Sequence, residues 1–152
     1  MSHRVKILFE FDGGKLGSKE VESMWAIPTE NGFSIDNIPF YAQELALGDV
    51  IAASPDADGM LRFDRLVVTS NHSTVRLWFD EGSVDQVPRI RQELRDLGCS
   101  SELSNLPRLV AVDIPPTVPY VHIRNVLDRY EQAGLVEYEE SCLVGGTPSA
   151  CS

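Results

Sequence analysis

The chain has 152 residues, of which 43% are hydrophobic and 24% are charged, so it is long enough for one domain or for two small subdomains that share a core. Its 13 Lys and Arg against 23 Asp and Glu give a formal net charge of −10, which argues against binding to a nucleic-acid backbone or an anionic membrane surface. The apolar runs are too short to span a bilayer, and no secretory signal is visible. Cys99, Cys142 and Cys151 are too widely spaced for a disulfide framework, so we expect a cytoplasmic protein.

The first half of the chain is predicted to consist of short strands. Val5, Ile7, Phe9 and Phe11 alternate with more polar residues, which is typical of a half-buried strand. Similar patterns and their bounding turns predict strands over residues 5–11, 21–27, 33–38, 49–53 and 61–68. Residues 13–18 are expected to form a flexible turn, Pro28 to end the second strand, and residues 39–47 to hold one helical turn. Residues 1–70 are therefore predicted to form a strand-rich subdomain, a small bent antiparallel sheet or barrel.

The second half alternates strands and helices. Strands are predicted over residues 74–79, 100–103, 109–114 and 136–143. Apolar residues recur at helical spacing in two stripes: Val87, Ile90, Leu94 and Leu97 before Gly98, and Ile123, Val126, Leu127 and Tyr130 before Gly134. The order β-α-β-β-α-β predicts a ferredoxin-like subdomain over residues 71–143, and residues 144–152 are expected to be a disordered tail. The predicted fold class is thus α+β, with the strand-rich half packed on the ferredoxin-like half.

Five segments are informative when they are taken together: the string Asp-Asn-Ile-Pro-Phe-Tyr-Ala at residues 36–42, and residues 21–26, 45–50, 72–76 and 136–140. With these segments the chain resembles the bacterial family catalogued as domain of unknown function 4265. The resemblance covers roughly residues 4–143, and the string at residues 36–42 is its most specific part. The resemblance implies a stand-alone bacterial protein of this size, and it brings no activity and no catalytic residues with it.

The residues that carry enzyme chemistry do not gather into a recognisable motif. His3, His72 and His122 have no second ligand at zinc-binding spacing, and no phosphate-binding loop or nucleophile elbow is present. Asp56 and Asp58 lack the remaining ligands of a calcium loop. His72 beside Ser73 and Thr74 is consistent either with a general base next to a hydroxyl or with a polar turn. We therefore expect no enzyme activity, no metal and no cofactor.

The open face of the second subdomain offers a binding surface. Arg76 and Trp78 should face away from the helices, and Arg76 is expected to pair with Glu137 or Glu139 on the neighbouring strand. The apolar ring of Trp78 is expected to be buried, either against the strand-rich half or against a partner. RNA is a disfavoured partner because the third strand of the subdomain has no aromatic residue and the surroundings are acidic.

Two function hypotheses follow. In the first, the chain is an acidic immunity protein that neutralises a basic toxin, with Glu137, Glu139 and Glu140 on an edge strand and Asp80 and Glu81 close by. The same charges also suit plain solubility or protection of the edge strand. In the second hypothesis, the chain is a regulatory module whose subdomain seam binds a small ligand, and the residues predicted to line that seam are Asp36, Asn37, Tyr41 and His72. The competing interpretation of Asp36 and Asn37 is that they satisfy backbone groups where a strand bends.

Overall fold

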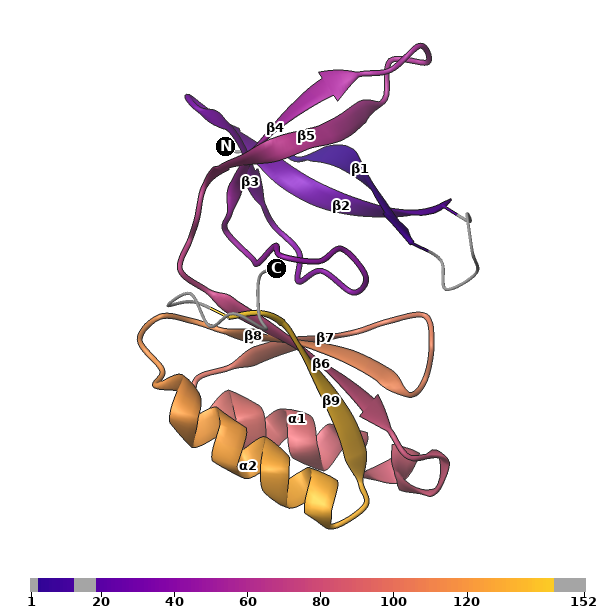
Figure 1. The fold of residues 1–152 in the computed structure, drawn as a ribbon, viewed down its shortest axis with the longest axis vertical. Helices are drawn as coiled ribbons and strands as arrows, with labels where there is room; N and C mark the ends of the chain where they lie inside the picture. The colour runs from indigo at the N-terminus through magenta and orange to yellow at the C-terminus, as the bar shows by residue number, and fades with distance from the viewer. Residues whose placement is uncertain (1–2, 13–18, 144–152) are drawn as a thin grey trace.

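The N-terminal half forms a closed five-stranded barrel. The computed structural model describes residues 3–12 and 19–143, and Figure 1 shows the barrel above a second, helix-covered sheet. The strands, in chain order and in barrel order, are β1 (Val5–Asp12), β2 (Lys19–Thr29), β3 (Gly32–Ile35), β4 (Val50–Pro55) and β5 (Leu61–Val68). Successive strands are antiparallel, but β1 and β5 close the barrel as a parallel pair. An odd number of alternating strands makes the first and last run in the same direction.

The barrel interior is filled mainly by alternate residues of the strands, which agrees with the alternation predicted for residues 5–11. Ile7, Phe9, Met24, Ile35 and Ile51 are almost completely buried, and together with Ala26, Ala42 and Leu45 they form one cluster. The β2–β3 turn at Glu30 and Asn31 is the predicted hairpin. A Cβ at Gly32 would lie 2.3 Å from the Ile51 carbonyl oxygen, so this position accepts only glycine without a shift of β4.

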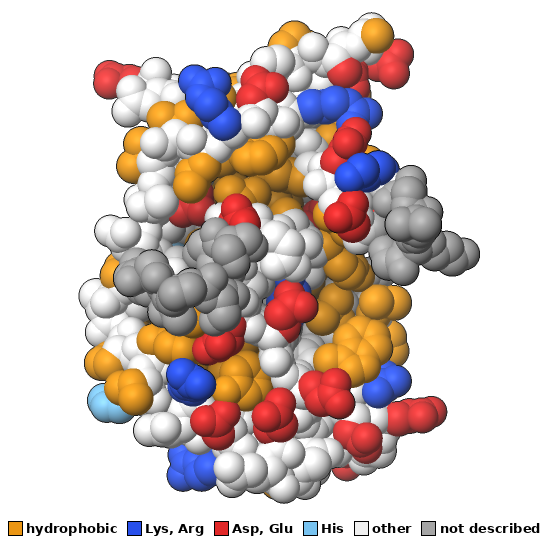
Figure 2. Space-filling view, viewed as in Figure 1, with side chains coloured by type: hydrophobic (Ala, Val, Ile, Leu, Met, Phe, Trp, Pro, Cys, Tyr) orange, Lys and Arg blue, Asp and Glu red, His pale blue; other side chains and the backbone are white. Residues whose placement is uncertain are grey.

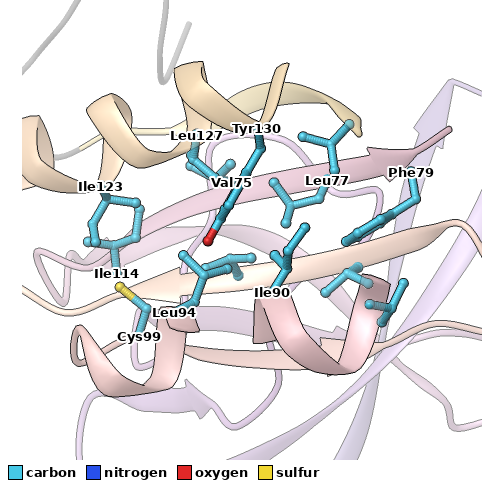
Figure 3. Packing of buried hydrophobic residues seen from close by; sticks show 14 residues of the cluster. Val75, Leu77, Phe79, Ile90, Leu94, Cys99, Ile114, Ile123, Leu127 and Tyr130 are labelled. Atoms are coloured by element: carbon cyan, nitrogen blue, oxygen red, sulfur yellow. The ribbon is translucent and has the colours of Figure 1, made fainter. Parts of the chain in front are cut away.

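The C-terminal half is a four-stranded sheet with helices on one face. Its elements are β6 (Ser73–Phe79), η1 (Glu81–Gln86), α1 (Val87–Asp96), β7 (Ser100–Leu103), β8 (Leu109–Ile114), α2 (Tyr120–Gln132) and β9 (Val136–Cys142). The strand order is β7-β8-β6-β9 with all neighbours antiparallel, which leaves β7 and β9 at the edges. Figure 3 shows Leu94 of α1 and Ile123 and Leu127 of α2 pointing toward the side chains of the sheet. Among the described residues no helix is long and apolar enough to cross a membrane.

Four details differ from the sequence expectations. Residues 36–49 contain no helical turn and instead form an irregular segment between β3 and β4. Strand β2 continues through Pro28, because the β1 ladder ends at Ala26 and no strand on that side needs the missing N–H group. Leu97 was predicted to lie in the core but is 42% exposed, because α1 ends at Asp96 and the chain leaves the helix stripe. Val126 is only partly buried at the edge of that core.

Two predicted segments, the turn at 13–18 and the tail at 144–152 with Cys151, lie outside the described residues.

Candidate functional site

The irregular segment 36–49 lies between the barrel and the open face of the sheet (Figure 1). Such a segment has backbone N–H groups that no strand or helix satisfies, so other acceptors must be supplied. Glu22 of β2, which is 9% exposed, supplies three of them. Its carboxylate accepts hydrogen bonds from the N–H groups of Phe40, Tyr41 and Ala42 at 2.7, 3.1 and 2.9 Å. Strand β2 therefore fixes the path of residues 40–42.

Two further carboxylates hold the rest of the segment. Glu102 of β7 accepts from the N–H group of Ile38 at 2.7 Å and from the Asn37 side chain at 3.4 Å. Asp49 is buried and accepts from the N–H groups of Ala46 at 2.9 Å and Ser70 at 2.8 Å. Carboxylates from both halves of the molecule thus anchor this one segment.

Arg76 lies at the centre of the contact between the two halves. It is only 6% exposed, and its Nη1 donates to Glu139 Oε1 at 2.7 Å. Its Nη2 donates to the carbonyl of Ala42, while the buried Nε has no hydrogen-bond partner among the described residues. Burial lowers the pKa of Arg76 below its usual value, and the nearby Glu139 carboxylate opposes that shift. Gln43 also donates to Glu139 Oε1, at 3.3 Å, so Glu139 is held from both halves.

A cleft of about 400 Å³ opens beside this contact. Its apolar wall comes from both halves: Phe11, Phe40 and Tyr41 on the barrel side, and Trp78, Leu106 and Leu109 on the sheet side. The rings of Phe11 and Tyr41 stack with centroids 4.9 Å apart. The polar lining includes Arg76, Glu137 and Glu139. Figure 2 shows hydrophobic side chains on the right where the two halves meet, with acidic side chains spread over the lower half.

Comparison with known proteins identifies the family. The family model described as Domain of unknown function (DUF4265) matches residues 22–138. The chain belongs to the DUF4265 family. The match extends from Glu22 to Tyr138 and so covers most of the cleft. No curated protein sequence matches the chain significantly.

The DUF4265 chain also shares its fold with a solved structure. That structure is of a hypothetical protein from Neisseria gonorrhoeae, with a TM-score of 0.75 at 21% sequence identity. The alignment covers 93% of this chain and 96% of the other, so the likeness includes both the barrel and the helix-covered sheet.

In this DUF4265 protein the residues predicted to bind a partner do not form one strip. Arg76, Trp78, Glu137 and Glu139 all line the cleft, and the expected pair of Arg76 with Glu139 is confirmed. Glu140 instead accepts a hydrogen bond from the Tyr120 hydroxyl, because alternation along β9 places Glu140, like Val136 and Tyr138, on the helix-covered face of the sheet. Asp80 caps η1 by accepting from the Gly82 N–H at 3.0 Å, and Glu81 is exposed on η1.

The residues predicted to line a ligand seam are also separated. Only Tyr41 lines the cleft, and burial, with Glu22 nearby, raises the pKa of its hydroxyl. Asp36 forms an ion pair with the Arg4 side chain at 3.1 Å. Asn37 Oδ1 accepts from the Trp25 N–H at 2.6 Å, so Asn37 satisfies a backbone group where the chain leaves β3. His72 Nδ1 lies 2.8 and 3.0 Å from the two carboxylate oxygens of Asp113.

The His72–Asp113 pair joins the connection between the two halves to strand β8. Asp113 is 3% exposed on β8, while His72 lies in the connection between the two halves, just before β6. Burial raises the pKa of the Asp113 carboxyl, and His72 opposes this rise. The nearby Cys99 is also buried, which raises the pKa of its thiol to about 11, so it is a neutral thiol at pH 7. The described residues contain no group of three or more His, Cys, Asp or Glu placed to hold a metal ion.

Glu22, Glu102 and Asp49 were not predicted from the sequence as site residues. Each lies in a segment with ordinary strand or loop character, and their roles depend on backbone groups of a distant part of the chain. One signal in the sequence could have pointed to them. The segment between β3 and β4 has no regular secondary structure, so its backbone N–H groups need hydrogen-bond acceptors from other parts of the chain.

Proposed function

We propose that this DUF4265 protein is a non-catalytic binding protein, and specifically a cytoplasmic immunity protein that binds and neutralises a basic toxin. The observation that carries the proposal is the position of Glu137 at the cleft. Its side chain is exposed on edge strand β9, and among residues 3–12 and 19–143 its carboxylate has no ion pair or hydrogen bond. An unpaired carboxylate beside exposed aromatic surface suits a basic protein surface, because interface cores favour aromatic anchors and charge complementarity speeds association.

The net charge of the chain supports the same proposal. At −10 it would steer a positively charged partner toward the molecule over distances of about a Debye length. The anchored cleft adds a place for such a partner to dock, since its walls are fixed by Glu22 and Arg76 rather than by loose loops.

The proposal includes the organisation of the chain. We assign residues 1–70 to a barrel subdomain and residues 71–143 to a ferredoxin-like subdomain, for which the strand order β7-β8-β6-β9 and the two helices on one face are the support. The partner then contacts the seam of the two subdomains.

A second candidate function is a regulatory module that binds a small molecule at this seam. The observation that favours it is the cleft itself, whose volume of about 400 Å³ lies in the range of small-ligand sites and whose apolar lining is mostly aromatic. Of the residues predicted for that role, Tyr41 alone lines the cleft, so the ligand would contact Tyr41, Trp78 and Arg76. A shift in melting temperature with a metabolite but not with a basic protein would favour this candidate.

The test of the immunity proposal has two stages. Affinity capture from the source cells with mass spectrometry identifies the partner, and co-expression shows whether the chain relieves that partner's toxicity. Association rates are then measured at two salt concentrations for the native chain, Glu137→Lys and the control Glu30→Lys, which reverses an exposed charge in the β2–β3 turn. We expect Glu137→Lys to slow association and reduce its salt dependence more than the control. A captured partner without toxicity, or equal rates for both variants, would refute the proposal.

A further inference from the structure

We propose that the cleft between the barrel and the sheet receives the side chain of an arginine from the protein partner. This inference rests on the proposed function and deepens it by naming the group that the site recognises. Its basis is the combination of flat aromatic surface and carboxylates at one opening.

The sheet places Trp78 and Glu137 side by side. They are paired across β6 and β9, so their side chains are neighbours on the face that looks toward the barrel. Glu139 follows two residues along β9 on the same face. Trp78 is 38% exposed, and Glu137 is exposed, so both remain accessible to a group that enters the cleft.

A guanidinium group matches this arrangement better than an ammonium group does. Its flat face stacks on an aromatic ring while its in-plane N–H groups donate to a carboxylate, whereas an ammonium group has no flat face to stack. The stacked Phe11 and Tyr41 rings on the opposite wall extend the apolar surface that would cover the methylene stem of the arginine.

The positive charge of Arg76 does not exclude a second cation. Arg76 is bonded to Glu139 at 2.7 Å, and a further carboxylate, that of Glu22, lies close enough to favour its charged form. Its own guanidinium is buried, whereas Glu139 keeps 57% of its side chain exposed. An arginine that enters the cleft therefore meets two carboxylates: the exposed part of Glu139, and Glu137, which has no ion pair or hydrogen bond among the described residues.

The molecule already makes contacts of this type. The Arg108 guanidinium lies 4.9 Å from the Trp78 ring centroid; Arg108 lines a neighbouring hollow, which Trp78 and Glu137 also line, and does not line the cleft. On the barrel, Arg4 lies 4.9 Å from the ring centroid of Trp25. Among the described residues that line the cleft, Arg76 is the one cation, and it makes no cation–π contact with Trp78.

The test uses Trp78 fluorescence in a Trp25→Phe background, which leaves Trp78 as the only tryptophan of the chain. Three blocked glycine tripeptides serve as probes, with arginine, lysine or citrulline at the centre, because citrulline has nearly the shape of arginine without its charge. We expect saturable binding of the arginine peptide, with a Kd on the order of 1 mM for so small a probe. Lysine and citrulline peptides should bind at least about fivefold more weakly.

Two variants, each of which removes one negative charge, test whether the arginine peptide binds in the cleft. Glu137→Gln should weaken arginine-peptide binding about fivefold or more, while Glu30→Gln, which removes the same charge far from the cleft, should leave it unchanged. Absence of saturable binding, equal binding of citrulline or lysine, or equal effects of the two variants each overturns the inference. A negative result with the arginine peptide does not refute the immunity proposal, because that proposal is tested by the toxicity of the captured partner and by its association rate. A toxin that binds without any change in Trp78 emission would leave that proposal standing and remove the arginine site.

Discussion

Replacing Glu22 with glutamine should destabilise the whole molecule, although the two side chains have nearly the same shape. The Glu22 carboxylate accepts three backbone N–H groups of residues 40–42, two on Oε1 and one on Oε2. Glutamine keeps one oxygen and replaces the other with an NH₂ donor. If the amide oxygen takes the Oε1 position, the NH₂ group faces the N–H of Phe40 at the position where the carboxylate accepts at 2.7 Å.

The expected loss follows from these contacts. The Phe40 N–H loses its acceptor, which costs about 1–3 kcal/mol for a buried donor. The other two hydrogen bonds lose their ionic character, and a neutral bond is weaker than a charge-assisted one by about 1 kcal/mol. Together these changes predict a decrease of about 3–5 kcal/mol in the free energy of unfolding, a large part of the stability of an ordinary domain.

Urea denaturation of the native chain and the variant measures this difference. Glu20→Gln is the matched control, because Glu20 lies two residues earlier on β2 and is exposed. We expect the control to change the free energy of unfolding by about 0.5 kcal/mol or less. A loss below about 1 kcal/mol for Glu22→Gln would show that the three hydrogen bonds do not hold the segment, and the account of the cleft wall would be wrong.

Three other predictions test the core, the barrel and the response to pH. Leu94→Ala should cost about 2–5 kcal/mol by denaturation because Leu94 is completely buried, whereas Leu97→Ala should cost less than about 1 kcal/mol; equal losses would contradict the assigned core. Gly32→Ala should lower the melting temperature, because its Cβ would meet the Ile51 carbonyl oxygen at 2.3 Å, and an unchanged value would mean that β4 yields freely. The folded state holds the Cys99 proton more tightly than the unfolded state does, with the pKa raised to about 11. The resulting stabilisation is present below pH 9 and should disappear as the pH rises through about 11, so Cys99→Ala should flatten the alkaline part of a stability profile.

Periodicity in the sequence predicted most elements of the fold. The alternation in β1 and the stripe Ile90, Leu94 on α1 each mark one buried face, and hydrophobic burial then requires an element to cover it. A pairing of Arg76 with Glu137 or Glu139 was accessible too, because strand order and alternation together place these side chains on one face of neighbouring strands.

Local sequence patterns could not reveal which groups far apart in the chain pair with one another. The parallel closure of β1 on β5, the capture of residues 40–42 by Glu22 and the pairing of His72 with Asp113 all join residues that are far apart in the chain. Glu22 alternates along its strand like any other residue, and nothing near it in the sequence distinguishes it from Glu20.

The sequence by itself determined the elements, their buried faces and the acidic character of the chain, since these depend on side-chain type and on short-range spacing. Only the tertiary structure decided that the buried Arg76 pairs with Glu139 and not with Glu137, and that Glu140 accepts a hydrogen bond from Tyr120. Glu137 has no ion pair or hydrogen bond among the described residues. The physical reason is that spacing along a strand specifies the face of a side chain, whereas its partner and its exposure depend on which other elements pack against that face.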